Sequence, residues 1–323
     1  MRFFAFVFAL VVGCSSSSSG LSPPPGEGPA DSGTVVGNDA SMPSGPSLAK
    51  SSIGPIDVAA GEEKTVCINK RLDNTEDIVA TSFIADLAPG SHHLIVYRST
   101  ATTERLTPYA CAPFAGVVGS AEAPFLIATK PHLEYALPSG VGLPLAAGQM
   151  LKIEAHYINV TAAPIQGSGT IQVKGSPAAT AGTYEVADVG IWGTFNINVP
   201  PHATFQTPVN FQTGGAGMKV FGLTTHEHRL GTRMQVWASA QAGDVSKQVA
   251  DDKDWASPAF KTFDPPLAFD GKTGMSYQCD YDNTTDQAVT FGESALNEMC
   301  FILFYYYPAH GPDECFDNRC GKR

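Results

Sequence analysis

Short strand-like runs separated by glycine and proline turns fill most of this chain. The sequence holds 32 glycines and 24 prolines among its 323 residues, and no long amphipathic helical repeat stands out. Such a chain folds into many short strands joined by turns rather than into packed helices. The sequence therefore predicts an all-β protein.

The expected strands form two groups on either side of residues 176–182, a run of small residues typical of a domain junction. The first group is 64–68, 82–87, 94–97, 151–160 and 170–173, and the second is 186–192, 195–199, 218–223, 232–238, 288–291 and 300–307. Two all-β domains of this size are best interpreted as tandem sandwiches, at residues 51–178 and 179–323. The pattern alone leaves jelly-roll and immunoglobulin-like versions open.

The N-terminus is typical of an exported chain. Arg2 and the apolar run 3–12, too short to span a bilayer, form a signal that ends in a glycine before Cys14. This ending resembles a bacterial lipobox, which would make Cys14 the lipidated mature N-terminus; the alternative is an ordinary signal peptide with an incidental cysteine. Because Ser15 follows the cysteine, we expect an outer-membrane lipoprotein of the cell envelope, periplasmic or surface-exposed and attached only through its lipid. Residues 15–50 are too rich in Ser, Gly and Pro to fold, so we expect a disordered tether, with the folded part starting near Ile53.

An even number of cysteines remains after Cys14, which in an exported chain indicates disulfides. They are Cys67, Cys111, Cys279, Cys300, Cys315 and Cys320. Six cysteines allow fifteen pairings, and the sequence alone does not choose among them. The net charge of -11, with no long Lys/Arg run, argues against nucleic acid or an anionic lipid surface as partner.

Two histidines lie at strand spacing in Thr225-His226-Glu227-His228-Arg229-Leu230-Gly231. Residues i and i+2 of a strand project from the same face, so the imidazoles of His226 and His228 can grip one metal ion. The alternative is a pair of surface histidines at a strand end.

Three further histidines are candidate ligands in the first sandwich. His92 and His93 are adjacent and open a strand after a Pro-Gly turn, so both can reach one metal only if the strand is irregular there. His156 lies on the polar face of its strand with Lys152 and Glu154, which predicts that it points to water or into a cleft. A packed or solvated histidine is the alternative at each position.

Met299 opens the apolar run 300–307, where a methionine is usually a core residue. Its thioether is also a soft ligand that, together with imidazoles, suits copper(I) better than zinc or magnesium. The other histidines, His132, His202 and His310, each stand near a proline without a second donor at ligand spacing, and we interpret them as structural or surface residues.

The order of these motifs resembles the copper type II, ascorbate-dependent monooxygenases, from about Cys67 to Pro308. The resemblance implies that His92, His93 and His156 hold an electron-transfer copper, and that His226, His228 and Met299 hold the copper that binds oxygen. It also implies two jelly-roll-like sandwiches whose coppers face each other across a wet cleft. Two disulfides, Cys67–Cys111 and Cys279–Cys300, are implied in the same way, and Cys315 and Cys320 are paired with each other by default.

Three positions depart from the family pattern. Thr224 and Leu303 stand where peptide-acting members place an arginine and a tyrosine that grip a substrate carboxylate. A peptide ending in glycine is therefore not expected as substrate, and nothing identifies a catechol pocket. Glu227 replaces a threonine, and we expect its carboxylate to point away from the metal into solvent.

We therefore expect a monomeric copper-dependent monooxygenase that hydroxylates a C–H bond of a small organic substrate with O2. It would use two copper ions per chain and ascorbate or another small reductant. One alternative is a copper-binding lipoprotein without turnover, used for sequestration or sensing. The other is a purely structural or adhesive β-sandwich.

Overall fold

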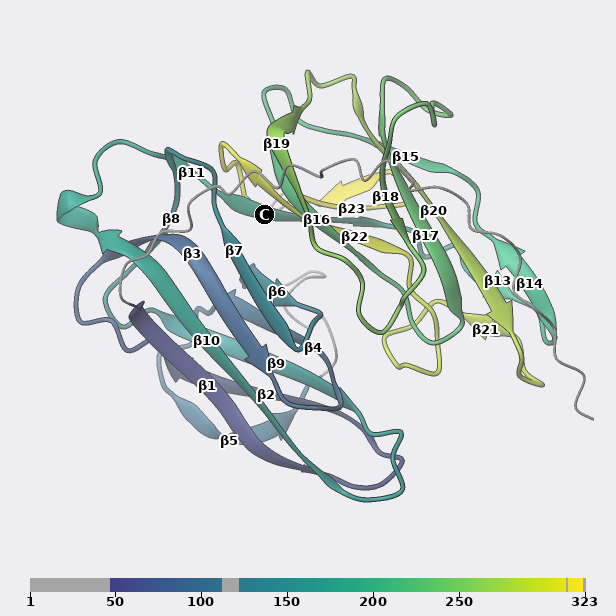
Figure 1. Cartoon of the computed structure of the whole chain (residues 1–323), viewed down its shortest axis with the longest axis horizontal. Coiled ribbons are helices and arrows are strands. Elements are labelled where there is room, and N and C mark those ends of the chain that lie inside the picture. The colour runs from purple at the N-terminus through teal and green to yellow at the C-terminus, as the bar shows by residue number, and fades with distance from the viewer. Residues whose placement is uncertain (1–46, 112–121, 312, 322–323) are drawn as a thin grey trace, which may run out of the picture. The chain divides into compact units, whose positions relative to one another are not determined.

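The computed structural model describes residues 47–111, 122–311 and 313–321 (Figure 1). The predicted signal, Cys14 and the tether up to residue 46 lie outside this range. No helix in the described part of the chain is long and apolar enough to cross a membrane.

Almost every element in these ranges is a β-strand, which confirms the all-β prediction. The only helical segment among the described residues is a single 3₁₀ turn, Ala178–Thr180.

The first half contains two sheets. One has the order β1 (Ser47–Val58), β10 (Ile165–Pro177), β3 (Ile78–Leu87), β8 (Val141–Leu145) and β11 (Glu185–Val186), with β7 (His132–Ala136) also paired to β3. The other has the order β5 (Arg105–Ala110), β2 (Glu63–Arg71), β9 (Met150–Ile158), β4 (Ser91–Arg98) and β6 (Ala123–Ala128). Figure 1 shows β1, β10 and β3 in front of β5, β2 and β9. Apolar residues of both sheets, such as Ile171 on β10 and Leu94 on β4, belong to one buried core.

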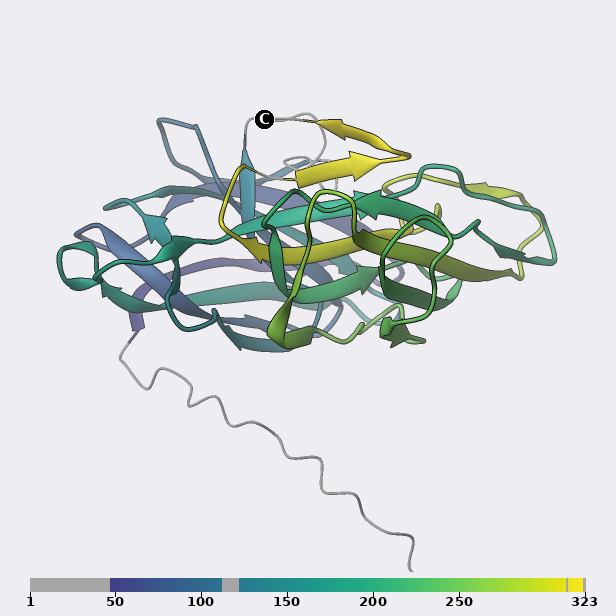
Figure 2. The same cartoon turned by 90° about the horizontal axis from the view of Figure 1, so that it is seen from above.

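The second half contains two larger sheets and one small one. The first has the order β19 (Lys261–Ala268), β16 (Lys219–His226), β22 (Phe301–Tyr307), β12 (Asp188–Gly193), β23 (Asp313–Phe316) and β24 (Arg319–Gly321). The second has the order β14 (Ala203–Gln206), β20 (Gly274–Asn283), β17 (Gly231–Ser239) and β18 (Gln248–Asp252), with β15 (Asn210–Thr213) paired to β20. The small sheet pairs β13 (Asn198–Val199) with β21 (Val289–Thr290). In Figure 2 the C-terminal hairpin β23–β24 (yellow) lies beside β12.

Strand β22 is buried on both faces, and its alternate residues belong to different cores. Phe301, Leu303 and Tyr305 join the core that includes the first half. Their neighbours Ile302 and Phe304 join the core of the second half. The Tyr305 hydroxyl also accepts a hydrogen bond from the backbone N–H of Ile127 on β6, at 2.9 Å. Strand β22 is therefore part of the wall at which the two halves meet.

The two halves share a corner motif that the sequence analysis missed. At the end of β9, the Asn159 side-chain amide donates to the carbonyls of Val58, Ala59 and Ala163. At the end of β20, Asn283 donates in the same way to Val199, Pro200 and Gln287. In each case a threonine two residues later donates its backbone N–H to the asparagine oxygen. The same Asn-x-Thr corner therefore anchors one loop in each half.

All three expected disulfides are present: Cys67–Cys111, Cys279–Cys300 and Cys315–Cys320. The last one joins directly opposite residues of the β23–β24 hairpin.

The expected starting point of the folded region was wrong. Strand β1 begins at Ser47, within the predicted tether, because its backbone pairs with β10 from Ser47 opposite Lys174 onward. The predicted domain boundary at 178/179 stays a prediction. Residues 47 onward lie in one compact unit, and β11, from the second predicted domain, pairs in parallel with β8 of the first.

Candidate metal centre

A bulge at the start of β4 brings the adjacent histidines to one side. The pairing of β4 with β9 runs from Ser91 opposite Tyr157 to His93 opposite His156, so His92 is the extra residue. A bulge inserts an unpaired residue and redirects its side chain. The irregularity that the adjacent histidines require is therefore present.

The imidazoles of His92, His93 and His156 form a first group. Each offers one nitrogen, and these nitrogens all lie within 4.8 Å of one another. The ring centroids are 5.4 Å apart for His92 and His93, and 5.0 Å apart for His93 and His156. All three side chains are buried.

His226 and His228 lie at the end of β16 and in the turn that follows. The turn is closed by a hydrogen bond of 2.9 Å from the Gly231 N–H to the His228 carbonyl. A Cβ at Gly231 would lie only 2.7–2.9 Å from atoms of the Glu227 side chain. The glycine of the His-x-His-x-x-Gly motif is therefore needed because Glu227 packs over it.

His226 and His228 form a second group, and its third member is His92. The ligand nitrogens of these three residues also lie within 4.8 Å of one another. The His92 ring is 5.2 Å from that of His226 and 5.7 Å from that of His228. Membership of His92 in this group was not predicted, because strand periodicity says nothing about contacts between the halves.

The two groups thus form one five-histidine cluster. The wet cleft expected between two separate sites is not found among the described residues, since all five histidines are buried and neighbouring rings are in contact. The physical reason is that the bulged His92 projects toward His226 on the wall between the halves.

In two of these rings, one nitrogen makes a hydrogen bond to the protein and the other nitrogen has no protein partner. The Nε2 of His156 donates to Glu63 at 3.0 Å, and the Nδ1 of His228 donates to the Asn297 carbonyl at 3.1 Å. Because those oxygens only accept, the opposite nitrogen of each ring carries a lone pair whenever that ring is neutral. These nitrogens, His156 Nδ1 and His228 Nε2, are buried and have no hydrogen-bond partner, and neither has Nε2 of His92. A carbonyl or carboxylate behind a ring with a free nitrogen is the arrangement found around metal-ligating histidines.

Burial also keeps four of the five rings of the cluster neutral. It lowers the pKa of His92, His93 and His226 well below the ordinary 6.5, with neighbouring imidazoles as a further cause. Burial lowers the pKa of His228 to about 4. Neutral imidazoles are the form that binds metal. The donor set therefore fits a borderline or soft ion such as copper.

Met299 lies beside this cluster in the backbone. On the register His226 opposite Phe301, two further residues would place Met299 opposite His228. Glu298, the residue before Met299, connects the two segments: its carboxylate accepts hydrogen bonds from the backbone N–H groups of His228 and Leu230, at 3.0 and 2.8 Å. Met299 is 1% exposed and belongs to the core that the halves share. Its position is compatible with the predicted ligand role, which stays a prediction.

Of the two alternatives expected for His156, water or a cleft, burial excludes water, and the expectation that Glu227 is solvated was wrong. His156 does not point to water: its strand β9 is central, and the polar face of that strand is covered by Tyr97, Glu122 and the histidine cluster. Glu227 is not solvated either, since it is 4% exposed. Burial and the nearby Glu298 raise the pKa of Glu227 well above its usual range.

Two residues that contact the cluster were missed from the sequence. Glu63, at the start of β2, holds His156, and hydrogen bonds from His156, then the Ala295 N–H and Ser294, help lower its pKa to about 2 despite partial burial. Glu63 gave no sequence signal, because it is one of many surface-type acids. Trp255 lies 5.8 Å from the His92 ring, centroid to centroid, and is partly exposed. A lone tryptophan in the polar run Asp251-Asp252-Lys253-Asp254-Trp255 could have been a signal.

The loop that carries Trp255 is anchored next to the histidines. The Asp252 carboxylate accepts hydrogen bonds from the hydroxyl of Thr225 and the N–H of Ala259, at 2.9 and 3.0 Å. At the far end of the loop, the Phe260 ring packs 5.2 Å from that of Tyr135. The loop therefore runs from the histidine cluster to the aromatic core.

The two positions that lack the family's carboxylate grip are cross-strand neighbours. Thr224 on β16 pairs with Leu303 on β22, and both are buried. Thr224 lies two residues before His226 on the same strand face. Its hydroxyl has no hydrogen-bond partner. No positive charge is supplied by this pair of positions.

The remaining histidines lie elsewhere. His132 and His202 are exposed and pair with Asp86 and Asp286, and His310 packs on Tyr306. None of the three belongs to either histidine group.

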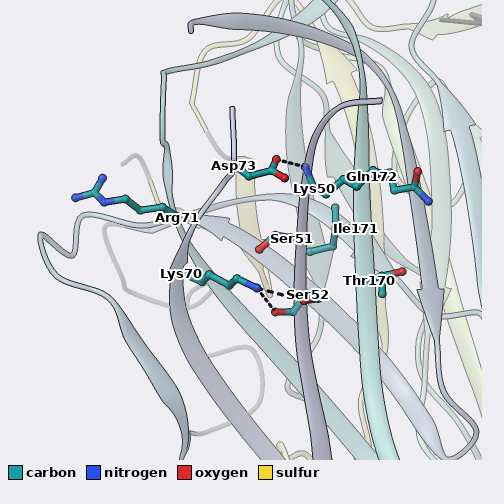
Figure 3. A pocket seen from close by; sticks show the side chains of 9 residues that line it. All are labelled: Lys50, Ser51, Ser52, Lys70, Arg71, Asp73, Thr170, Ile171 and Gln172. Atoms are coloured by element: carbon teal, nitrogen blue, oxygen red, sulfur yellow. Dashed lines mark hydrogen bonds between the residues drawn. The ribbon is translucent and has the colours of Figure 1, made fainter. Parts of the chain in front are cut away.

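A groove of about 460 Å³ lies between β1, β2 and β10, and no histidine lines it (Figure 3). Its cations are already engaged in part: the Lys70 ammonium donates to Ser52, and Arg71 donates to two backbone carbonyls. The groove offers no donor set for metal chemistry.

Comparison with known proteins points to one family. Residues 198–321 match the model for the C-terminal domain of the copper type II ascorbate-dependent monooxygenases. A Homo sapiens DBH-like monooxygenase protein 2 is 26% identical over 198 residues, which is 56% of this chain and 39% of that protein. The chain therefore spans well under half the length of this relative.

Solved structures resemble the chain only weakly. The major capsid protein P2 of bacteriophage PM2 gives a TM-score of 0.34 at 10% identity, covering 81% of this chain and 99% of that one. A PNGF-II structure gives a TM-score of 0.23 at 8% identity, covering 74% and 59%. TM-scores this low carry no argument.

Proposed function

Because the chain belongs to the copper type II ascorbate-dependent monooxygenase family, we propose that it hydroxylates a C–H bond of a small organic substrate. The co-substrates are O2 and a reductant, which is ascorbate or another small molecule. The five-histidine cluster and Met299 hold two copper ions per chain.

One observation carries the proposal. Three imidazole nitrogens, on His92, His156 and His228, are buried without a hydrogen-bond partner while their rings converge on one another. An unpaired buried polar atom is destabilising, by about 1–3 kcal/mol, so a cluster of them needs a ligand. Copper suits imidazole and thioether donors.

The five histidines and Met299 suffice for two ions of three ligands each only if His92 binds a single one of the two ions. With His93 and His156 it completes an all-imidazole set, and Met299 then completes the set of His226 and His228. A thioether favours the reduced metal. Copper would supply the electrons and the O2 activation, as in metal-dependent oxidations generally.

The side chains of this chain hold and shield that chemistry. Glu63 and Asn297 fix the rings of His156 and His228, and Glu298 fixes the turn that carries His228. Trp255 covers His92 from the outside. Closed burial of this kind keeps water away from a reacting site.

The substrate is an uncharged small organic molecule rather than a carboxylate-bearing peptide. Thr224 and Leu303 offer one hydroxyl and one apolar side chain where the peptide-acting members have a grip for an anion. We further propose that the protein acts as a monomer in the bacterial cell envelope, anchored by lipid at Cys14.

Copper titration followed by O2 uptake tests the function. We expect two copper ions per chain, and reductant-dependent O2 consumption with an accepted small organic substrate. The double variant His226→Ala, Met299→Ala should lose that consumption, while His202→Ala, which removes an exposed histidine, should keep it. Unchanged consumption in the double variant would refute the mechanism.

A copper-binding protein without turnover is the second candidate, since every candidate ligand is retained and the anionic grip is absent. It would bind copper normally and consume no O2 with any substrate of a broad panel. The convergence of the histidines disfavours the third candidate, a purely structural sandwich.

A further inference from the structure

The Glu63 carboxylate contacts two separate segments next to the histidine cluster: the His156 ring and the loop at Ser294 and Ala295. Its Oε1 accepts hydrogen bonds from His156 Nε2 at 3.0 Å and from the Ala295 N–H at 2.7 Å. Its Oε2 accepts from the Ser294 hydroxyl at 3.1 Å. One carboxylate from β2 thus binds a histidine of the first group and a loop that is more than two hundred residues away in sequence.

That loop, residues 291–298, is held closed by its own backbone. The Gly292 N–H donates to the Glu298 carbonyl at 3.2 Å, and the Asn297 N–H donates to the Ser294 carbonyl at 2.8 Å. An isolated bridge also joins Phe291 and Glu298. A loop closed in this way moves as a unit. Hydrogen bonds that fix Ser294 and Ala295 therefore also restrain the positions of Asn297 and Glu298.

The other end of the loop binds the second histidine group. The Asn297 carbonyl accepts from His228 Nδ1, and the Glu298 carboxylate accepts from the His228 N–H. Hydrogen bonds and one short loop therefore connect His156 to His228: from the ring of His156 to Glu63, through the loop, and back to the ring of His228.

We propose that Glu63 is a positioning residue that locks the two histidine groups together by holding the His156 ring and the 291–298 loop with one carboxylate. The proposal deepens the proposed copper function and rests on it for its role in catalysis. The locking itself concerns only residues of the chain and exists without metal. Since a carboxylate behind an imidazole raises its basicity as a ligand, losing it should weaken metal binding by 10- to 100-fold.

Glu63→Gln tests this with minimal change of shape. In the metal-free protein, backbone amides of residues 291–298 should exchange hydrogen about tenfold faster or more than in the wild type, since a hydrogen bond to a charged group is lost. With copper(II) bound, the electron paramagnetic resonance signal of the histidine-bound metal should shift, and copper affinity should fall 10- to 100-fold. Glu62→Gln is the matched control: Glu62 is the preceding residue and binds the Ala59 N–H and Lys64 instead.

Ser294→Ala approaches the same contact from the loop side. It should accelerate exchange in residues 291–298 and add little when combined with Glu63→Gln, because the two changes break one interaction. This variant keeps the test valid if Glu63→Gln folds poorly. Unchanged exchange in the loop with either variant, or an unchanged copper signal in Glu63→Gln, would overturn the proposal. If exchange and the copper signal change as expected while even the wild type consumes no O2, the locking stands and the oxygenase function falls.

Discussion

Acid should destabilise the metal-free protein through its buried imidazoles, and His228 allows the effect to be calculated. Burial lowers the pKa of His228 from 6.5 to about 4. The unfolded chain therefore binds a proton at this residue below about pH 6.5, whereas the native state binds it only when the pH falls to about 4. The contribution of His228 to stability is complete at pH values above its pKa in the unfolded chain. It is lost as the pH falls toward its pKa in the folded protein.

The magnitude follows from the size of the pKa gap. At about 1.4 kcal/mol per unit, the full loss for His228 is about 3 kcal/mol, of which about 2 kcal/mol is already lost at about pH 5. The other lowered histidines act in the same direction. Glu298, whose pKa burial raises to about 7, acts in the opposite direction, since its contribution is lost as the pH rises through that value.

A difference measurement isolates His228 from these other groups. Asparagine at position 228 can still donate to the Asn297 carbonyl but cannot titrate. Urea unfolding with a chelator at about pH 7.5 and about pH 5 should show that the wild type loses about 2 kcal/mol more than His228→Asn on acidification. Equal losses in the two proteins would mean that His228 is not a buried neutral imidazole, and the ligand argument built on it would fail.

Three further predictions concern the corners, the motif glycine and the tryptophan. Asn159→Ala and Asn283→Ala should each lower the free energy of unfolding by about 2–4 kcal/mol, because each removes three hydrogen bonds that a buried side-chain amide donates to backbone carbonyls. Asn210→Ala, at an exposed contact, should change it little. Chemical denaturation of the three variants measures this, and a neutral Asn283→Ala would refute the shared corner. Gly231→Ala should destabilise the protein by about 1–3 kcal/mol because the new methyl overlaps Glu227, whereas Gly321→Ala, with nothing within 4 Å, should be neutral in the same assay. Bound copper(II) should quench the fluorescence of Trp255, which lies 5.8 Å from His92, and should raise the melting temperature in a concentration-dependent way. Trp255→Phe should abolish most of the quenching and keep the melting shift, and quenching that survived the substitution would place the metal elsewhere.

Local patterns were enough to predict several of the strands and the motifs that carry the candidate ligands. The Pro-Gly turn before His92 allowed the irregularity that the β4 bulge provides. The strand-like run 218–223 and the apolar run 300–307 predicted strands close to the observed positions of β16 and β22. Strand β20 was missed although Met275, Tyr277, Cys279 and Tyr281 alternate with polar residues, so that signal was available.

Contacts between the halves could not be predicted in this way. Strand periodicity assigns His156 to a polar face but cannot reveal that Tyr97, Glu122 and the cluster cover that face. The sharing of His92 and the reach of Glu63 to Ser294 depend on how two sheets meet, which no local spacing encodes. Glu227 was misjudged for the same reason: its burial depends on the turn that folds over Gly231.

Anomalous diffraction at the copper absorption edge, from crystals grown with copper, tests the central claim most directly. The account predicts strong anomalous peaks within bonding distance of the imidazoles of His92, His93, His156, His226 and His228, with one of them also bonded to the Met299 sulfur. Peaks confined to the exposed His132, His202 or His310, with none in the cluster, would contradict it.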